Sequence, residues 1–583
     1  MKPITKQPLK ARASSTRLGF LAAASGFAIV TALSGLSAQS TETSASGGYT
    51  TAGIPIGDDV FGLQPVGVGP TAQAGAVKDL APTNISTAEA PLRRGRWTTS
   101  VTAYGQTSVT FSDNINLESD GFEEEEYVGT VTLGATLTAE NERLSGQLSG
   151  NVSYDTFFND TNDDGVRADV STNWSAAVVP NLFYVDVAGG ISESFVTGDR
   201  FSGNVVANSD DRITSFYGLI SPSVRKNIGG WANAELRYTA QGQYFDEDDF
   251  EGGISQTFSA GLTSDPRKFR RFGWQAATEY EIFTPEDDDR DDDIERWTSY
   301  ASVDVPVSRT LAVTGTVGYD FFNEDIADDD LSGLFGNAGL RWQPTTRFAA
   351  RAFGGYRYDG FDYGAEANYA LRQNVVAGVQ ARRGVQFTNF AQGNSATAIP
   401  SQIGADGRVT SFESAVGPGT TTNIDDALAF DNRNPTTLAR FGDINSNNQD
   451  DDGIVDTVQA YIAGSTGRTS WNASVQAADY DYGSAFGADE LILTASAGAS
   501  RELTSRLAVN AGVGFSLVDF DAASGTALET SDFETLSIGV GLDYQLTEIV
   551  NVFGRYTYSE RFADQSVDEY TENAAVIGVS ASF

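Results

Sequence analysis

The chain has 583 residues, with 78 Asp and Glu against 38 Lys and Arg, so its formal net charge is −40. It contains no Cys and no His. These absences exclude disulfide scaffolds, the usual zinc ligand sets and His-dependent catalysis. A chain this acidic would repel the phosphate backbone of a nucleic acid, so we expect no nucleic-acid partner.

The first 38 residues have the pattern of an export signal. Five Lys and Arg precede an apolar run over 18–36, and Ser37 and Ala38 follow it. A basic start, an apolar middle and small residues at the exit are typical of a Sec-type signal peptide. The alternative, a membrane anchor, is disfavoured because Ser25, Gly26 and Gly35 interrupt the run. Cleavage after residue 38 would take the net charge from −40 to −45, because five positive charges and no negative ones are lost.

Residues 39–96 are rich in Gly, Pro, Thr, Ser and Ala and show little periodicity. Such a composition is typical of a flexible segment, so we expect an N-terminal arm or a plug.

From Trp97 to Phe583 the pattern changes to regular alternation. Leu536, Ile538 and Val540, for example, are separated by single Ser or Gly residues. Successive side chains of a strand point to opposite faces of the sheet. Each segment therefore has one apolar face and one face of small or polar residues.

The polar face distinguishes a membrane barrel from a soluble sandwich. A sandwich would expose bulky charged residues, whereas here the polar face is mostly small and uncharged. Tight connectors also alternate with longer acidic ones, of which 388–456 is the largest. The pattern predicts an all-β fold, a transmembrane antiparallel up-and-down β-barrel of about 22 strands, within a range of about 16 to 24. We expect short periplasmic turns, long acidic extracellular loops and residence in the bacterial outer membrane, in contact with its lipid and lipopolysaccharide.

Two segments carry a resemblance to known families. The end of the chain, Val579-Ser580-Ala581-Ser582-Phe583, resembles the terminal signature of Gram-negative outer-membrane barrels. That resemblance implies that Phe583 is an assembly signal read by the barrel assembly machinery. Residues 109–117, read as the first strand, are similar to the opening strand of β-barrel porins associated with exopolysaccharide and PEP-CTERM loci.

Charged residues on the small-residue face are the first candidate site, because that face would line the lumen. Strand parity places eleven of them there: Arg341, Arg347, Arg351, Arg357, Arg372, Arg382, Glu366, Glu235, Arg237, Glu279 and Glu281. Two interpretations stay open. The arginines could face carboxylates across a constriction and set up a transverse field, or the charges could pair with one another and fill a plugged lumen.

Acidic loops are the second candidate site. Alternating oxygen ligands around a Gly suit Ca²⁺, which takes 6 to 8 oxygen ligands. The first motif resembles a thrombospondin-type or RTX-like calcium loop, and a shorter motif repeats the theme. The residues concerned are Asn448, Asp450, Asp452 and Asp456 in the first, and Asp160, Asn162 and Asp164 in the second. Solvated turns with no metal are the alternative, and no other cofactor is expected.

The sequence favours a channel for passive diffusion of hydrophilic solutes or for export-linked polysaccharide. A non-conducting surface barrel whose Ca²⁺-binding loops mediate attachment or surface-layer contact is the second reading, and a secreted soluble adhesin is the third. Catalysis is not expected, because acidic runs such as 123–126 look too exposed to act as general acid and base.

Overall fold

The computed structural model describes residues 98–583 with gaps. The predicted signal peptide, 1–38, and the predicted arm, 39–96, lie outside the described residues. The gaps are residues 120, 142, 160, 196–205, 207–211, 247–251, 266–267, 270, 286–293, 324–330, 346, 358–359, 373–374, 387–401, 404–408, 412–452, 482–488, 522–531 and 564–568.

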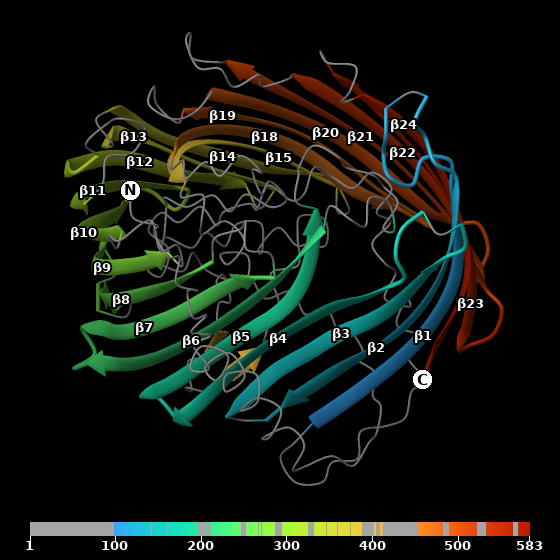
Figure 1. Ribbon diagram of the computed structural model, residues 1–583. Coiled ribbons are helices and arrows are strands. Elements are labelled where there is room, and N and C mark those ends of the chain that lie inside the picture. The colour runs from blue at the N-terminus through green and yellow to red at the C-terminus, as the bar shows by residue number, and fades with distance from the viewer. Residues whose placement is uncertain are drawn as a thin grey trace, which may run out of the picture.

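Twenty-two strands form one antiparallel sheet, and a separate two-stranded pair, β16 and β17, lies in the segment between β15 and β18 (Figure 1). No helix in the described part of the chain is long and apolar enough to cross a membrane. The strands are β1 (Thr98–Ser112), β2 (Glu126–Glu140), β3 (Leu144–Phe157), β4 (Gly165–Val179), β5 (Phe183–Phe195), β6 (Arg212–Ile228), β7 (Ala232–Phe245), β8 (Gly253–Ser264), β9 (Gly273–Pro285), β10 (Ile294–Pro306), β11 (Leu311–Phe322), β12 (Gly333–Thr345), β13 (Phe348–Arg357), β14 (Gly360–Arg372), β15 (Val375–Gln386), β16 (Gln402–Ile403), β17 (Val409–Ser411), β18 (Gly453–Thr466), β19 (Thr469–Asp481), β20 (Asp489–Glu502), β21 (Leu507–Asp521), β22 (Phe533–Gln545), β23 (Val550–Ala563) and β24 (Tyr570–Ser582).

Pairing between the first and last strands closes the sheet into a barrel. β1 pairs with β2 on one side and with β24 on the other, in a register that sets Tyr104 opposite Ser582. Beyond the strands, Phe583 N donates to Ala103 O at 2.7 Å, and Ala103 N donates to Phe583 O at 3.1 Å. Closure leaves the large sheet without an edge strand, and the predicted antiparallel barrel of 22 strands is confirmed.

Strand parity separates an exposed apolar face from a buried polar face. In β22 the side chains of Ile538, Val540 and Leu542 are 40%, 45% and 51% exposed, whereas Ser537 is 4% exposed. The same alternation runs through β2 and β11. A closed barrel with an apolar outer surface satisfies its backbone groups within the sheet and offers hydrocarbon to lipid. The chain is therefore an outer-membrane β-barrel.

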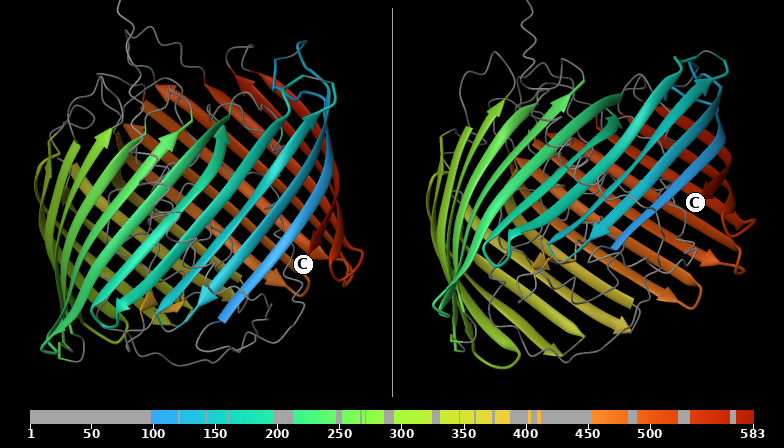
Figure 2. Two further views of the ribbon diagram at one scale, coloured as in Figure 1. Left: turned by 60° about the horizontal axis from the view of Figure 1, so that its bottom comes forward. Right: turned by 90° about the horizontal axis from the view of Figure 1, so that it is seen from below.

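The two rims differ in their connections, as Figure 2 shows. One rim carries tight turns and both ends of the barrel sequence, because β1 begins there and β24 ends there. The β6–β7 turn shows how such a turn is made. Gly229 and Gly230 both adopt positive φ, of 60° and 72°, and Asn227 Oδ1 accepts a hydrogen bond from Gly230 N at 2.8 Å. We call this edge the short-turn rim and the opposite edge the loop rim.

The first strand predicted from the sequence, 109–117, extends five residues beyond the end of β1 in the structure. β1 ends at Ser112, and the following residues fold back over the seam between β1 and β24. Asp113 accepts bonds from Asn573 N at 2.7 Å and Asn573 Nδ2 at 2.9 Å. Asn114 Nδ2 donates to Glu118 O at 2.7 Å and to Thr571 O at 3.1 Å. Side-chain bonds to the local backbone compete with strand pairing, which is why the strand stops here.

One further boundary differs from expectation, at the end of the predicted loop 388–456. The segments 363–371 and 457–464 alternate more weakly than the rest, and both lie within strands, β14 and β18. β18 begins at Gly453, so the last four residues of the expected loop 388–456 are wall, not loop. Most of that loop lies outside the described residues.

We predict that a cation on the outer face destabilises the barrel far more than an apolar replacement there. Ile538 lies near the middle of β22 on the exposed face. An Arg near the bilayer midplane costs about 2 to 4 kcal/mol, so Ile538→Arg should lower the free energy of unfolding in liposomes by about that amount. Urea titration in vesicles measures it, with Ile538→Leu as control. Equal stability of the two variants would mean that this face does not contact hydrocarbon.

Candidate functional site

The inner face of the barrel is polar and carries ion pairs. Its buried residues include many Ser and Thr together with Asp, Glu and Arg. Eight of the eleven sequence-predicted lumen residues have described side chains that take part in ion pairs there: Arg341, Arg351, Arg357, Glu366, Glu235, Arg237, Glu279 and Glu281.

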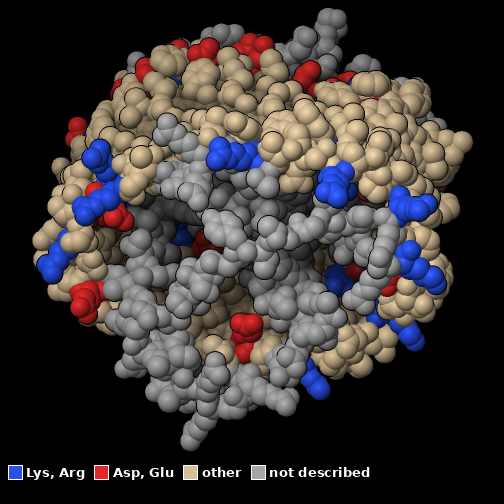
Figure 3. All heavy atoms as spheres, turned by 180° about the vertical axis from the view of Figure 1, so that it is seen from behind, with Lys and Arg blue, Asp and Glu red and all other residues tan. Residues whose placement is uncertain are grey.

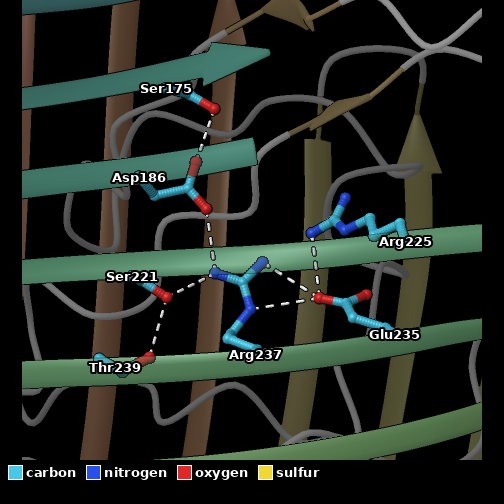
Figure 4. Close-up of polar contacts among 7 residues, drawn as sticks. All are labelled: Ser175, Asp186, Ser221, Arg225, Glu235, Arg237 and Thr239. Atoms are coloured by element: carbon cyan, nitrogen blue, oxygen red, sulfur yellow. Dashed lines mark hydrogen bonds and ion pairs between the residues drawn. The ribbon is translucent and has the colours of Figure 1, made fainter. Parts of the chain in front are cut away.

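A network of ion pairs joins β5, β6 and β7 (Figure 4). Arg237 Nη1 donates to Asp186 Oδ2 at 2.9 Å and to Ser221 Oγ at 2.8 Å. Glu235 Oε1 accepts from Arg237 Nε and from Arg225 Nη2, each at 3.2 Å. Two cations and two carboxylates therefore lie together on one patch of wall, and their charges cancel.

Both carboxylate oxygens of Asp186 accept hydrogen bonds. Oδ2 binds Arg237, and Oδ1 accepts from Ser175 Oγ of β4 at 2.6 Å. Its side chain is only 5% exposed. A carboxylate this buried is tolerable because an opposite charge and a hydroxyl replace its lost hydration.

Arg237 reaches Asp186 by crossing the strand that lies between them. Arg237 pairs in register with Ser223 of β6, and Asp186 pairs with Ser221 of the same strand. Neighbouring strands lie about 4.8 Å apart, so the two backbones are roughly 10 Å apart, a span that a long guanidinium side chain can close. Small residues on the middle strand leave room for the arginine to lie flat.

The same arrangement recurs twice farther along the inner wall, among β10 to β13. Arg341 of β12 contacts Asp304 of β10 at 3.2 Å, across β11. Arg357 of β13 binds Asp320 of β11 at 2.7 and 2.9 Å, across β12. In the second case the guanidinium stacks on Phe335 of the middle strand, 4.2 Å from the ring centre.

Adjacent strands supply the remaining pairs of the predicted set. Arg351 of β13 lies 3.7 Å from Glu366 of β14. Arg296 of β10 binds Glu281 and lies 3.6 Å from Glu279, both on β9. Every one of these inner-wall pairs joins residues no more than two strands apart. The charges therefore lie along the wall rather than reaching a partner across the lumen.

The other three predicted lumen arginines have no described ion pair on the inner wall. Arg347, predicted by strand parity to face the lumen, lies in the β12–β13 turn and is exposed, because β13 begins only at Phe348. Arg372 and Arg382 belong to β14 and β15, but their side chains are outside what the structure describes.

The predicted calcium ligands are only partly described. Asn448, Asp450, Asp452 and Asp160 lie outside the described residues. Asp164 accepts from Tyr154 OH and Phe157 N, both at 3.0 Å, and Asn162 Nδ2 donates to Asn116 Oδ1 at 2.8 Å. Asp456 lies on β18, 4.0 Å from Arg383. The described residues contain no group of three or more acidic side chains placed to hold a metal ion, and calcium stays a prediction for the remainder.

Several residues that form ion pairs with the predicted lumen residues were not predicted from the sequence. They include Asp186, Arg225, Arg296, Asp304 and Asp320. A local signal was present for two of them. Asp186 stands between Val185 and Val187, and Asp304 stands between Val303 and Val305. An acidic residue flanked by β-branched residues in an alternating segment indicates an inward carboxylate.

No protein-family model matches this chain, and no curated protein matches it. Several solved structures match it over most of its length. The siderophore receptor PirA from Pseudomonas aeruginosa is 11% identical over 85% of this chain and 82% of its own, with a TM-score of 0.41. The FrpB iron transporter from Neisseria meningitidis is 11% identical over 82% of each chain, with a TM-score of 0.46. Likeness at this level concerns the barrel architecture alone.

We predict that removing one partner from the Asp186–Arg237 pair is costly, whereas removing one from a peripheral pair is not. Arg237→Gln leaves a buried carboxylate without its cation and should destabilise the barrel by about 3 kcal/mol. Arg383→Gln, from the longer and more exposed pair with Asp456, should cost less than about 1 kcal/mol. Urea unfolding in vesicles compares the two. A double-mutant cycle with Asp186→Asn should show coupling, and additive effects would contradict the pairing.

Proposed function

We propose that the barrel is an outer-membrane channel that lets hydrophilic solutes pass through its lumen. The observation that carries this proposal is the inner wall itself, which is built from small hydroxyl residues and self-neutralised ion pairs. A wall of this kind hydrates easily and presents few apolar surfaces to a solute. We include polysaccharide among these solutes because residues 109–117 are similar to the opening strand of exopolysaccharide-associated porins.

The charge pattern bears on which ions would pass. Ion pairing along the wall leaves little net field inside, so the acidic loops at one mouth dominate ion selection. Exposed acids on the described part of that rim include Glu118, Glu123, Glu124, Glu125, Asp163 and Asp164. We therefore propose a preference for cations over anions at low salt, weakening as salt screens the loops.

The strand number favours a second candidate. Barrels of 16 to 18 strands commonly leave an aqueous channel, whereas 22-stranded outer-membrane transporters hold a plug in the lumen. The count of 22 therefore also suits a gated transporter with a filled lumen. Residues 39–96, expected as an arm or a plug, are the segment on which the two candidates differ.

We predict ohmic, cation-preferring conductance when the mature chain is inserted into a planar lipid bilayer. Reversal potentials in a salt gradient measure the preference, and heat-modifiable gel mobility confirms that the barrel is folded. A chain that lacks residues 39–96 should be made in parallel. Current from both forms supports the open channel, and current from the shortened form alone supports the plugged transporter.

Failure of both forms to conduct, with folding confirmed, would overturn the channel proposal.

The ion selectivity of a loop variant tests the role of the acidic loops. Replacing Glu123, Glu124 and Glu125 by Gln should reduce the cation preference while leaving the inner wall intact. Unchanged selectivity in this variant would mean that the loops do not govern ion entry.

A further inference from the structure

The short-turn rim carries a ring of basic side chains (Figure 3). In and beside the described connections at this rim, nine Lys and Arg are exposed, against three exposed Glu. Seven of the nine lie in or beside turns of two to four residues, and Lys268 and Arg271 lie in the eight-residue β8–β9 connection. The whole chain has the opposite balance, with twice as many acids as bases. We call these nine residues the basic collar: Arg143, Lys226, Lys268, Arg271, Arg309, Arg347, Arg468, Arg501 and Arg506.

Apolar side chains stand directly beside the basic collar. Val307, two residues before Arg309, is 61% exposed, and Leu503, between Arg501 and Arg506, is 48% exposed. Phe272, next to Arg271, is exposed as well. Such residues belong in hydrocarbon, so they bring their basic neighbours to the depth of the lipid headgroups.

Tryptophan marks the same level of the membrane. Five of the six Trp in the described strands and turns lie near the short-turn rim, and the sixth, Trp297, lies near the loop rim. Trp prefers the interface between hydrocarbon and headgroups. The five are Trp174, Trp231, Trp274, Trp342 and Trp471.

We propose that the basic collar binds the phosphate groups of anionic phospholipids in the leaflet that surrounds the short-turn rim. Basic residues at a membrane surface attract anionic lipid, and each contributes a favourable increment. The apolar residues and the Trp belt fix the depth at which these cations lie, which is why lipid, rather than a soluble polyanion, is the partner that the rim fits. This proposal concerns the outer surface and does not depend on what passes through the lumen.

The arrangement of Trp supplies a direct test. In a reporter chain with Trp97→Phe and Trp297→Phe, the remaining fluorescence comes from the short-turn rim. Quenching by brominated phosphatidylglycerol is compared with quenching by brominated phosphatidylcholine in mixed vesicles. We expect phosphatidylglycerol to be preferred by about fivefold at low salt, falling to about one at high salt.

Two matched variants of the reporter separate charge from structure. Replacing Arg143, Arg309, Arg468 and Arg506 by Gln should bring the preference to about one, whereas replacing the same four by Lys should retain most of it. All four side chains are exposed, and heat-modifiable mobility checks that each variant folds. An equal preference in the Gln and Lys variants would overturn the proposal. Binding to heparin, a soluble polyanion, is measured for the same variants. If the Gln variant lost heparin binding but kept its lipid preference, the proposal would be overturned and the basic collar would be assigned to a soluble polyanion.

Discussion

The structure depends on the hydrogen-bonding demand of the backbone in hydrocarbon. An unpaired N–H or C=O there costs several kcal/mol, so a sheet that crosses the membrane must have no edge. The pairing of β1 with β24 meets this demand, and the bonds of Asp113 and Asn114 to the region of Asn573 extend the seam beyond the strands. Short side chains that bind backbone groups thus fasten the junction between the first and last strands of the barrel.

Closure also explains why the charged side chains of the inner wall pair with partners along the wall and not across the lumen. Once the ring is closed, every polar side chain of one parity shares a single curved surface, and the nearest opposite charge is a strand or two away along that surface. Arg237, Arg341 and Arg357 each cross one intervening strand to reach an aspartate. A partner across the lumen would be farther away, and the attraction between opposite charges falls with distance.

The sequence predicts the parts of this architecture that depend on local pattern. It does not predict the contacts that depend on the register between neighbouring strands. Alternation gives the barrel, the number of strands and the inward parity of Arg351 and Glu366. It cannot name the partner of Arg237, because Asp186 becomes its neighbour only through two successive registers, β5 with β6 and β6 with β7. It also overextends the first strand, since the bonds that end β1 at Ser112 come partly from the far end of the chain.

Turn length and charge vary together around the barrel, and a physical reason links them. At the loop rim, the exposed acidic run Glu123–Glu125 belongs to a connection of 13 residues between β1 and β2, which is long enough to stand clear of the bilayer. Residues in two- to four-residue turns cannot stand clear, so whatever charge they bear is held at headgroup depth. An anion there would face lipid phosphate, whereas Lys or Arg would be attracted to it. The excess of bases over acids at the short-turn rim is therefore the charge pattern that short turns in a phosphate-rich layer favour.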